Sequence, residues 1–305
     1  MVLILVGVIF SGSPLFRRKM PYHKWVAVHR LMGPFYLVGV AHAFSVRTLI
    51  SELPLTRTYV FGMAALGVGS WIYKAFFHRL VHRTLPYEVV SVKKFGKAAV
   101  ELSLEPTGQA LQHRAGQFGF FSFPSLARSE SHPFTIASEP GAKALRVAVK
   151  ASGDFTSKLV EEIREGNPVG VEGPYGHLTQ EHVRGESQIW IAGGIGITPF
   201  LSLAHDLPRN GTRAALYWTV RSGDEAFFDE ELCSLAANNP AFSYTLWPSN
   251  DHGFLEMSDV KEIPEWKDPE FLICGPLALR DSLTRQVRES GTPSAQVHFE
   301  EFAFR

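Results

Sequence analysis

The stretch Gln188–Pro199, with the sequence QIWIAGGIGITP, decides the fold of the C-terminal part of the chain. It places an apolar run of strand length before a glycine-rich turn, and the following segment, PFLSLAHDL, has the apolar spacing of an amphipathic helix. Strand-like and helix-like segments then alternate up to the C-terminus: AALYWTV, EAFFDEELCSLAANN, FSYTLW, FLICG, PLALRDSLTRQVRES and QVHFEEF. This alternation predicts an α/β domain over residues 185–305, with a doubly wound parallel sheet that binds its ligand at the carboxyl ends of the strands.

The glycine-rich turn after the first of these strands is suited to an anion. Because glycine has no side chain, Gly193, Gly194 and Gly196 allow the backbone to approach a pyrophosphate. The helix that would present its N-terminus to this group starts near Thr198 and Pro199. The turn departs from the six-position dinucleotide fingerprint, because Pro199 stands where the third glycine would be. Taken alone, a purely structural turn is an equally good interpretation.

Residues 84–184 have a different pattern. Short alternating or apolar runs are separated by glycine and proline: YEVVSVKKF, KAAVELSLE, GQFGFFSF, HPFTIAS and ALRVAVKA. Runs of this length and spacing predict an antiparallel β-barrel, or a sandwich, that precedes the α/β domain.

Residues 1–83 have the composition of a membrane region. Apolar runs at about 2–16, 25–46 and 59–77 approach the roughly 20 residues needed to cross a bilayer, which predicts three transmembrane helices. Ten basic side chains and one acidic side chain accompany these runs, whereas the rest of the chain carries 20 basic and 29 acidic groups. Basic clusters follow the first and third runs and are expected on the cytoplasmic side. The sequence therefore predicts a multi-pass protein of a plasma or inner membrane, with everything after Arg83 in the cytoplasm.

The predicted second span contains His29 and His42, and ionisable groups inside a span are functional candidates because their burial in a bilayer is costly. Thirteen residues at about 1.5 Å each separate the two by roughly 20 Å, so they cannot share one iron. Each could bind one b-type haem axially, with the opposite ligand on another helix. Polar side chains that are hydrogen-bonded within a helix bundle are an equally good interpretation of this spacing.

Two classes of site are excluded or disfavoured by composition. Cys233 and Cys274 are the only cysteines in the sequence, so neither a disulfide framework nor a four-thiolate metal site can form within the chain. The formal net charge is zero, and the basic residues of the first third cluster beside apolar runs. A nucleic-acid partner is therefore not expected.

Seven motifs occur in a fixed order after residue 84: HPFTIAS, VKASGDFTSKL, VEGPYG, AGGIGITP, WTVRS, LICGP and FEEFAFR. This series resembles the ferredoxin-NADP reductase superfamily, and in particular its ferric reductase and NADPH oxidase branch. The resemblance implies that residues 84–184 form an FAD-binding barrel and that residues 185–305 form an NAD(P)-binding domain. It also implies a membrane part with two stacked b-type haems.

The resemblance assigns roles on the flavin side. It implies that the Phe134 ring packs against the isoalloxazine, that Thr135 hydrogen-bonds near flavin N5, and that His132 takes the place of an arginine on the pyrophosphate. The helix start after residue 152 would cradle that pyrophosphate, helped by Lys150. The further FAD-binding positions of these motifs are Pro133, Ser138, Lys150, Gly153, Phe155 and Thr156.

The resemblance also assigns residue roles on the nicotinamide side. Arg221 would accommodate a 2′-phosphate, which favours NADPH over NADH. Cys274 belongs to the motif beside the nicotinamide, and Phe302, with Phe304 second, would cover the flavin ring. The NAD(P)-binding positions are completed by Gly193, Gly194, Gly196, Thr198, Pro199, Gly275 and Pro276.

The implied activity is hydride transfer from NAD(P)H to FAD, followed by single-electron transfer to haem and then to a ferric chelate or dioxygen. The predicted catalytic positions are Thr135, Cys274 and Phe302. The family has six spans, however, and three are predicted here. Another membrane chain or self-association could complete the bundle. The alternatives are a haem-free, membrane-anchored flavin reductase and a truncated, non-catalytic remnant.

Overall fold

The computed structural model describes residues 31–46, 53–77, 83–127, 130–183, 185–210, 212–260, 266 and 268–300. The chain divides into two compact units, residues 1–83 and residues 84–305. The predicted first span, His29, Phe302 and Phe304 lie outside the described residues.

The first unit contains helix α4 (Met32–Ser45) and helix α6 (Pro54–Ile72), which continues as the π-helical turn η1 (Tyr73–Phe77). The continuous helix Pro54–Phe77 has 24 residues, a mean hydropathy of 1.4 and no buried residue in its apolar window, so it is long and apolar enough to cross a membrane. Among the described residues it is the one helix that meets these criteria. The three predicted spans are thus supported for one segment, and the other two stay predictions.

Helix α6 begins before the predicted apolar run at Tyr59. Pro54 occupies the first turn, where proline stabilises a helix start because its missing N–H needs no partner there. The Thr58 hydroxyl donates a hydrogen bond to the carbonyl of Pro54 at 2.9 Å, so this polar residue is part of the helix. The apolar count alone therefore placed the start five residues too late.

The second unit begins with a six-stranded antiparallel sheet in the order β4-β3-β6-β1-β2-β5. The strands are β1 (Leu85–Phe95), β2 (Ala99–Pro106), β3 (Phe118–Ser122), β4 (Ser131–Thr135), β5 (Leu145–Lys150) and β6 (Pro168–Tyr175). The two outer strands, β4 and β5, also contact each other, which curls the sheet around one apolar core. Helix α8 (Asp154–Glu162) contributes Leu159 and Val160 to that core. The predicted antiparallel architecture is confirmed, and β6, which the sequence analysis treated only as a turn motif, is one of its central strands.

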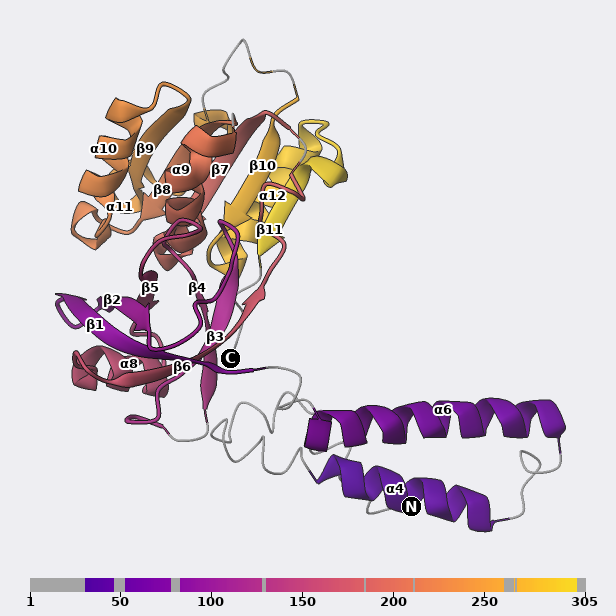
Figure 1. Cartoon of the computed structure of the whole chain (residues 1–305). Coiled ribbons are helices and arrows are strands. Elements are labelled where there is room, and N and C mark those ends of the chain that lie inside the picture. The colour runs from indigo at the N-terminus through magenta and orange to yellow at the C-terminus, as the bar shows by residue number, and fades with distance from the viewer. Residues whose placement is uncertain are drawn as a thin grey trace. The chain divides into compact units, whose positions relative to one another are not determined.

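The α/β domain follows, and its five-stranded parallel sheet has the order β11-β10-β7-β8-β9. Its strands are β7 (Ser187–Gly193), β8 (Arg213–Val220), β9 (Phe242–Pro248), β10 (Glu270–Cys274) and β11 (Val297–Glu300). Helices α9 (Thr198–Asn210) and α10 (Asp229–Asn238) cover one face of the sheet, and α12 (Leu277–Glu289) packs against the other. Figure 1 shows this layered domain beside the curved antiparallel sheet. The predicted doubly wound fold is confirmed.

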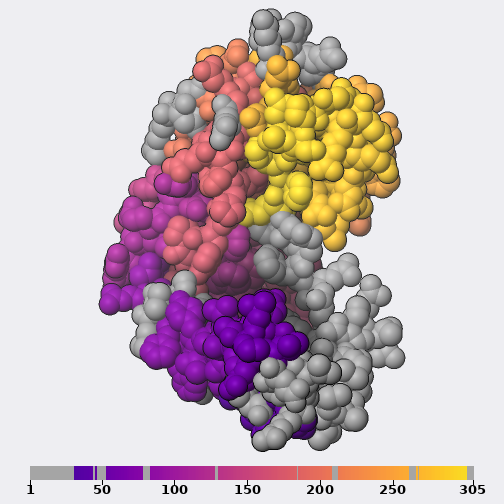
Figure 2. Space-filling view, turned by 90° about the vertical axis from the view of Figure 1, so that its right-hand side faces the viewer, coloured from indigo at the N-terminus to yellow at the C-terminus, as the bar shows by residue number. Residues whose placement is uncertain are grey.

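The two domains of the second unit share one apolar core. Ala137 and Ala148 of the antiparallel domain belong to the same buried cluster as Phe200 and Leu203 of α9. In Figure 2 the antiparallel domain, in purple to magenta, and the α/β domain, in salmon to yellow, lie directly against each other. The two domains are therefore joined by buried apolar packing, and their interface excludes water as a domain core does.

Candidate functional site

The strand order of the parallel sheet reverses at one point, where the general rule for such sheets places a ligand-binding crevice at the carboxyl edge. The chain leaves β7 toward β8 on one side, and β10 and β11 lie on the other side, so the order reverses between β7 and β10. Ligands of open α/β sheets bind at such a reversal. Gly193 ends β7, and Cys274, which pairs with Ala192, ends β10. The predicted glycine-rich turn and the predicted Cys-Gly-Pro turn therefore meet at the same point.

The two turns touch through glycines. A Cβ atom on Gly196 would lie 2.7 Å from the carbonyl carbon of Cys274 and 2.9 Å from the Cα of Gly275. A Cβ atom on Gly193 would lie 2.8 Å from the Cδ of Pro276. Packing against the backbone thus explains the glycine at 196, and packing against the side chains of Pro276 and Leu279 explains the one at 193. Both are structural reasons that need no ligand.

Gly194 is different, because a Cβ atom there would meet no atom within 4 Å and its φ is 54°, a left-handed conformation that favours glycine. The indole Nε1 of Trp218 donates a hydrogen bond to the Gly194 carbonyl at 2.8 Å. The Thr198 hydroxyl donates to the Ile195 carbonyl at 3.1 Å as the short 3-10 turn η2 (Gly194–Ile197) leads into α9. These two hydrogen bonds fix the turn. The Cα of Gly194 meanwhile faces open space near the N-terminus of α9, where a phosphate group could bind.

Lys150 lies beside this turn. Its ammonium is 3.1 Å from the carboxylate of Glu225, and both line a narrow cavity of about 10 Å³ together with Gly194, Trp218 and Phe227. A cavity of this size holds about one water molecule. The sequence analysis assigned Lys150 to the FAD pyrophosphate, and the structure places its charge against the NAD(P)-binding domain.

Several predicted flavin-binding residues come together at the start of α8. The rings of His132 and Phe155 stack at 3.7 Å with an interplanar angle of 11°. Thr156 Oγ1 accepts hydrogen bonds from the backbone N–H groups of Ser152 and Gly153, both at 3.0 Å, and so fixes the helix start. Burial lowers the pKa of His132 and outweighs the opposing effect of the Glu130 carboxylate. A neutral imidazole could still hydrogen-bond to a phosphate but would bring no charge.

The other flavin-motif residues lie along β4. Pro133 pairs with Phe120, Phe134 with Gly119, and Thr135 with Phe118, and Thr135 is buried. The Phe134 ring packs at 6.1 Å from that of Phe121 and at 6.5 Å from that of Phe123.

Ser138, the last predicted residue of the flavin motif, lies away from β4 at the junction of the two domains. Its hydroxyl accepts a hydrogen bond from the backbone N–H of Arg146 at 3.2 Å. Its carbonyl accepts one from the hydroxyl of Ser202 on α9 at 2.6 Å. The structure thus gives Ser138 a contact between domains, and its role toward FAD stays a prediction.

Glu300, at the end of β11, is a candidate that the sequence analysis missed. It pairs with Cys274, and its Oε2 atom is buried without a hydrogen-bond partner among the described residues. Burial raises the pKa of this carboxyl to about 8 and that of the Cys274 thiol well above its usual range. A Cβ atom on Gly176 would meet Glu300 Oε1 at 2.5 Å and the Phe118 ring at 3.1 Å. The carboxyl group therefore lies between the Cys274 turn and the strand that pairs with Thr135.

Glu300 belongs to the motif FEEFAFR, from which only the aromatic residues were predicted to be functional. A perturbed pKa in a buried carboxyl is typical of functional sites, and so is an unpartnered buried oxygen. Neither property can be read from the motif, because both depend on a strand that ends beside β10.

Two further predicted residues lie apart from this centre. Arg221 directly follows β8 at the carboxyl edge of the sheet and is exposed, as binding of a 2′-phosphate would require. His42 lies exposed in the last turn of α4. Within the described parts of the chain no group of three or more His, Cys, Asp or Glu side chains could hold a metal ion.

A parallel sheet with a glycine-rich turn at its switch point, joined through a buried interface to an antiparallel sheet, is the arrangement expected of a two-domain nucleotide-dependent flavoprotein. Family models agree with this class: one described as an FAD-binding domain matches residues 84–179, and one described as an oxidoreductase NAD-binding domain matches residues 190–284.

Curated relatives narrow the class. Ferric reduction oxidase 8 of Arabidopsis thaliana is 29% identical over 303 residues, which cover 88% of this chain and 39% of the plant protein. NADPH oxidase 1 of Mus musculus is 26% identical over 253 residues, which cover 66% of this chain and 42% of the mouse protein. The chain belongs to the ferric reductase and NADPH oxidase branch of the ferredoxin-NADP reductase superfamily.

The extent of these matches bears on function. The chain spans less than half the length of either relative, so the activity of a whole relative does not transfer to it directly. The match to the plant protein covers 88% of the chain and therefore extends from residues 84–305 into the helical unit. Among solved structures, the ferredoxin NADP+ reductase of Neisseria gonorrhoeae with bound FAD and NADP shares the fold with a TM-score of 0.60, 18% identity, and coverage of 71% of this chain and 98% of that chain.

Proposed function

We propose that this chain is the NAD(P)H-oxidising, FAD-containing part of a membrane-bound electron-transfer enzyme. The observation that carries the proposal is the contact between the glycine-rich turn after β7 and the Cys274 turn after β10, with the β3–β4 pair that holds Thr135 connected to them through Glu300. Glu300 lies between the latter two. A nicotinamide at the first two elements would face a flavin at the third.

The residues present fit both nucleotides. Two helix starts, at Asp154 and at Thr198, offer N–H groups that an α-helix leaves without internal partners, and each can take one pyrophosphate. Gly194 leaves open space beside the turn, so no side chain of its own would block the approach of an anion. Arg221 is exposed at the sheet edge, where it can bind a 2′-phosphate.

When bound, FAD supplies a two-electron acceptor that can pass electrons on singly. The chain's own residues then act by position. Thr135 has a short hydroxyl that can donate a hydrogen bond without blocking the approach of a nicotinamide, and Cys274 borders the same approach from β10. Glu300 is held neutral by burial at neutral pH, so it can donate a hydrogen bond to a polar group of a bound nicotinamide. Phe302, which lies outside the described residues, is proposed to cover the flavin face.

The membrane part and the terminal acceptor belong to the proposal as well. Helix Pro54–Phe77 would anchor the chain in a bilayer with the nucleotide-binding unit in the cytoplasm. His42 is the one imidazole in the described part of α4 and α6, so a haem on it would need a second axial ligand from elsewhere, such as a partner membrane chain or a second copy. We propose a ferric chelate or dioxygen as the acceptor.

The test is an absorption spectrum of the detergent-purified protein before and after anaerobic NADPH. Bleaching of the flavin bands within seconds supports the proposed hydride transfer, and absence of bleaching in protein that retains FAD refutes it. A Soret band that sharpens on reduction supports delivery to haem, whereas flavin bands alone favour the haem-free, membrane-anchored reductase. NADH in a parallel titration decides between the two nicotinamide cofactors.

A further inference from the structure

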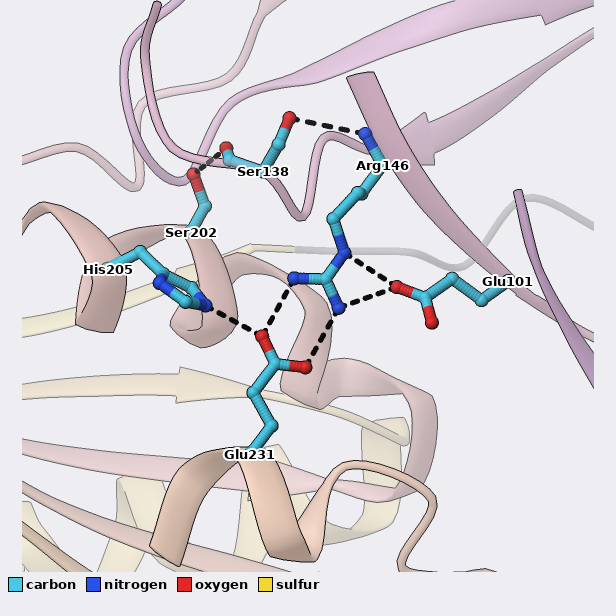
Figure 3. Close-up of polar contacts among 6 residues, drawn as sticks. All are labelled: Glu101, Ser138, Arg146, Ser202, His205 and Glu231. Atoms are coloured by element: carbon cyan, nitrogen blue, oxygen red, sulfur yellow. Dashed lines mark hydrogen bonds and ion pairs between the residues drawn. The ribbon is translucent and has the colours of Figure 1, made fainter. Parts of the chain in front are cut away.

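The interface between the two nucleotide-binding domains contains a charged cluster that none of the assigned roles uses. Arg146, on β5 of the FAD-binding domain, donates two parallel hydrogen bonds to the carboxylate of Glu231 at 2.7 Å and 2.8 Å. Its Nε donates a third to Glu101 on β2 at 2.6 Å. His205 on α9 donates to the same Glu231 carboxylate at 2.6 Å. Figure 3 shows Arg146 between the two carboxylates, with His205 on the far side of Glu231.

We propose that Arg146, Glu231 and His205 form a positioning clasp that holds the NAD(P)-binding domain in the orientation needed for hydride transfer. This inference rests on the proposed function, because it concerns how that reaction is aligned. None of the three clasp residues is itself a predicted nucleotide-binding position, although the backbone N–H of Arg146 donates to the Ser138 hydroxyl. Their side chains would therefore act through the geometry of the interface.

The bond between Arg146 and Glu231 constrains the orientation of the two domains as well as their separation. A guanidinium is a planar fork, and a bidentate bond to a carboxylate fixes both distance and angle, which a lysine ammonium cannot do. The side chains of Arg146, Glu101 and Glu231 are between 11% and 26% exposed, so solvent screens their charges only in part. Burial alone would raise the pKa of Glu231, but hydrogen bonds from Arg146 and His205 outweigh it and lower that pKa to about 2. The carboxylate is therefore charged at every pH at which the protein is expected to work.

The clasp is attached to the helix that carries the glycine-rich turn. His205 lies seven residues after Thr198, which is about 10 Å along α9 at 1.5 Å per residue. Between them, Ser202 donates its hydrogen bond to the Ser138 carbonyl of the FAD-binding domain. A tilt of α9 by about 5° around the clasp would move its N-terminus by about 1 Å, and a displacement of that size can slow a reaction by about 100-fold.

A second contact from β5 prevents the NAD(P)-binding domain from rotating about the Arg146–Glu231 pair. Lys150 lies four residues after Arg146, about 13 Å along the strand, and pairs with Glu225 of the other domain. Phe95 adds a third contact, since its ring stacks on that of Phe227 at 4.6 Å. Three separated attachments define one orientation, whereas the apolar alanine and leucine contacts of the interface would allow sliding. The clasp is the attachment with the most stringent geometry.

The experiment compares wild type, Arg146→Lys, Glu231→Gln and a control, Lys143→Met. Lys143 also pairs with a carboxylate, Glu105, but it is 85% exposed and both partners lie within the FAD-binding domain. Each protein is reconstituted with FAD, and its reduction by NADPH is followed by anaerobic stopped flow. Long-wavelength charge-transfer absorbance of the nicotinamide–flavin pair reports stacking, and thermal unfolding with FAD content reports the fold.

We expect flavin reduction to slow by about 10- to 100-fold in both clasp variants and the charge-transfer absorbance to fall, while NADPH affinity and FAD content stay near wild type. Lys143→Met should match wild type. Wild-type reduction rates in the FAD-loaded fraction of both clasp variants would overturn the proposal, and so would a rate loss fully accounted for by lost FAD. If either clasp variant fails to fold, His205→Gln takes its place, and the same outcomes apply. A wild type that NADPH does not reduce would refute the proposed function itself, which is a distinct result.

Discussion

Replacement of Gly196 by alanine tests the nucleotide crevice most directly. Its Cβ atom would lie 2.7 Å from the carbonyl carbon of Cys274 and 2.9 Å from the Cα of Gly275. Both neighbours belong to the backbone and cannot rotate away, so the two turns must separate. Ordinary contact distances require a movement of about 0.5 to 1 Å, which corresponds to an overpacking cost of about 1 to 3 kcal/mol.

This movement opens the crevice at the point where the nicotinamide is proposed to bind. A misplacement of about 1 Å slows an aligned reaction by up to about 100-fold, so we expect Gly196→Ala to slow flavin reduction at saturating NADPH by about 10- to 100-fold. FAD content should stay at the wild-type level, because the residues predicted to bind the FAD pyrophosphate and to contact the flavin near N5 lie in the other domain. Anaerobic stopped flow measures the first quantity, and absorbance of released flavin after denaturation measures the second.

The matched control is Gly108→Ala. A Cβ atom there would have one contact, with Pro86 Cγ at an ordinary 3.8 Å, and the position lies far along the chain from either turn. If Gly196→Ala reduces its flavin as fast as Gly108→Ala, the two turns do not frame the hydride-transfer site. If Gly196→Ala loses FAD in proportion to its rate, the defect is one of folding and the reasoning about the crevice is also wrong.

Three other substitutions test single residues. The raised pKa of Glu300 means that the neutral carboxyl stabilises the fold fully below the ordinary value of 4.5 and that this contribution is lost as the pH rises through about 8. The wild-type free energy of unfolding should therefore fall by at most about 5 kcal/mol between pH 4.5 and about 8, and Glu300→Gln should remove this decline. The unfolding temperature measured across this pH range reports the difference, and parallel profiles of wild type and variant would contradict the assignment. Thr135→Ala should slow flavin reduction more than it weakens FAD binding, and equal losses measured by stopped flow and flavin titration would disprove its role near N5. Arg221→Ala should raise the Kd for NADPH by about 10- to 100-fold and leave that for NADH unchanged, since it removes one charge-assisted contact with the 2′-phosphate, and equal changes for both cofactors would exclude it.

The sequence predicted those parts of the fold whose signals are local. The run Gln188–Pro199 contains an apolar strand, its glycine turn and the start of the next helix, so both the parallel sheet and its crevice could be inferred from a dozen residues. Most strands of the antiparallel domain were equally visible, because each is a short alternating or apolar run. Strand β3 alternates between buried and half-buried residues, whereas β2 begins with four buried residues in a row. Strand β6 was the exception, since two of its eight residues, Gly170 and Gly173, are glycines and a Gly-Pro pair, which is typical of a turn, precedes its last residue, Tyr175.

The interface residues could not be predicted in this way. Arg146 and Glu231 are 85 positions apart, and each looks like an ordinary charged residue in its own segment. Lys150 illustrates the same limit, because its motif suggested a flavin pyrophosphate while the fold brings it to Glu225. Glu300 became a candidate only when β11 was seen to end beside Cys274. Such pairings depend on how elements that are distant in sequence pack, and no local pattern encodes that packing.

This division follows from what the proposed reaction needs. Hydride transfer between two bound cofactors requires no nucleophile and no general base, so the chain supplies close approach and fixed orientation. The close approach of the two turns can be predicted from local sequence, because it requires glycines such as Gly196 and Gly275, whose lack of a side chain lets the turns touch. Orientation is supplied by contacts between domains, of which the Arg146 fork is the most constrained. If the clasp sets the rate of flavin reduction as proposed, the part of the mechanism specific to this chain lies in the residues that no motif contains.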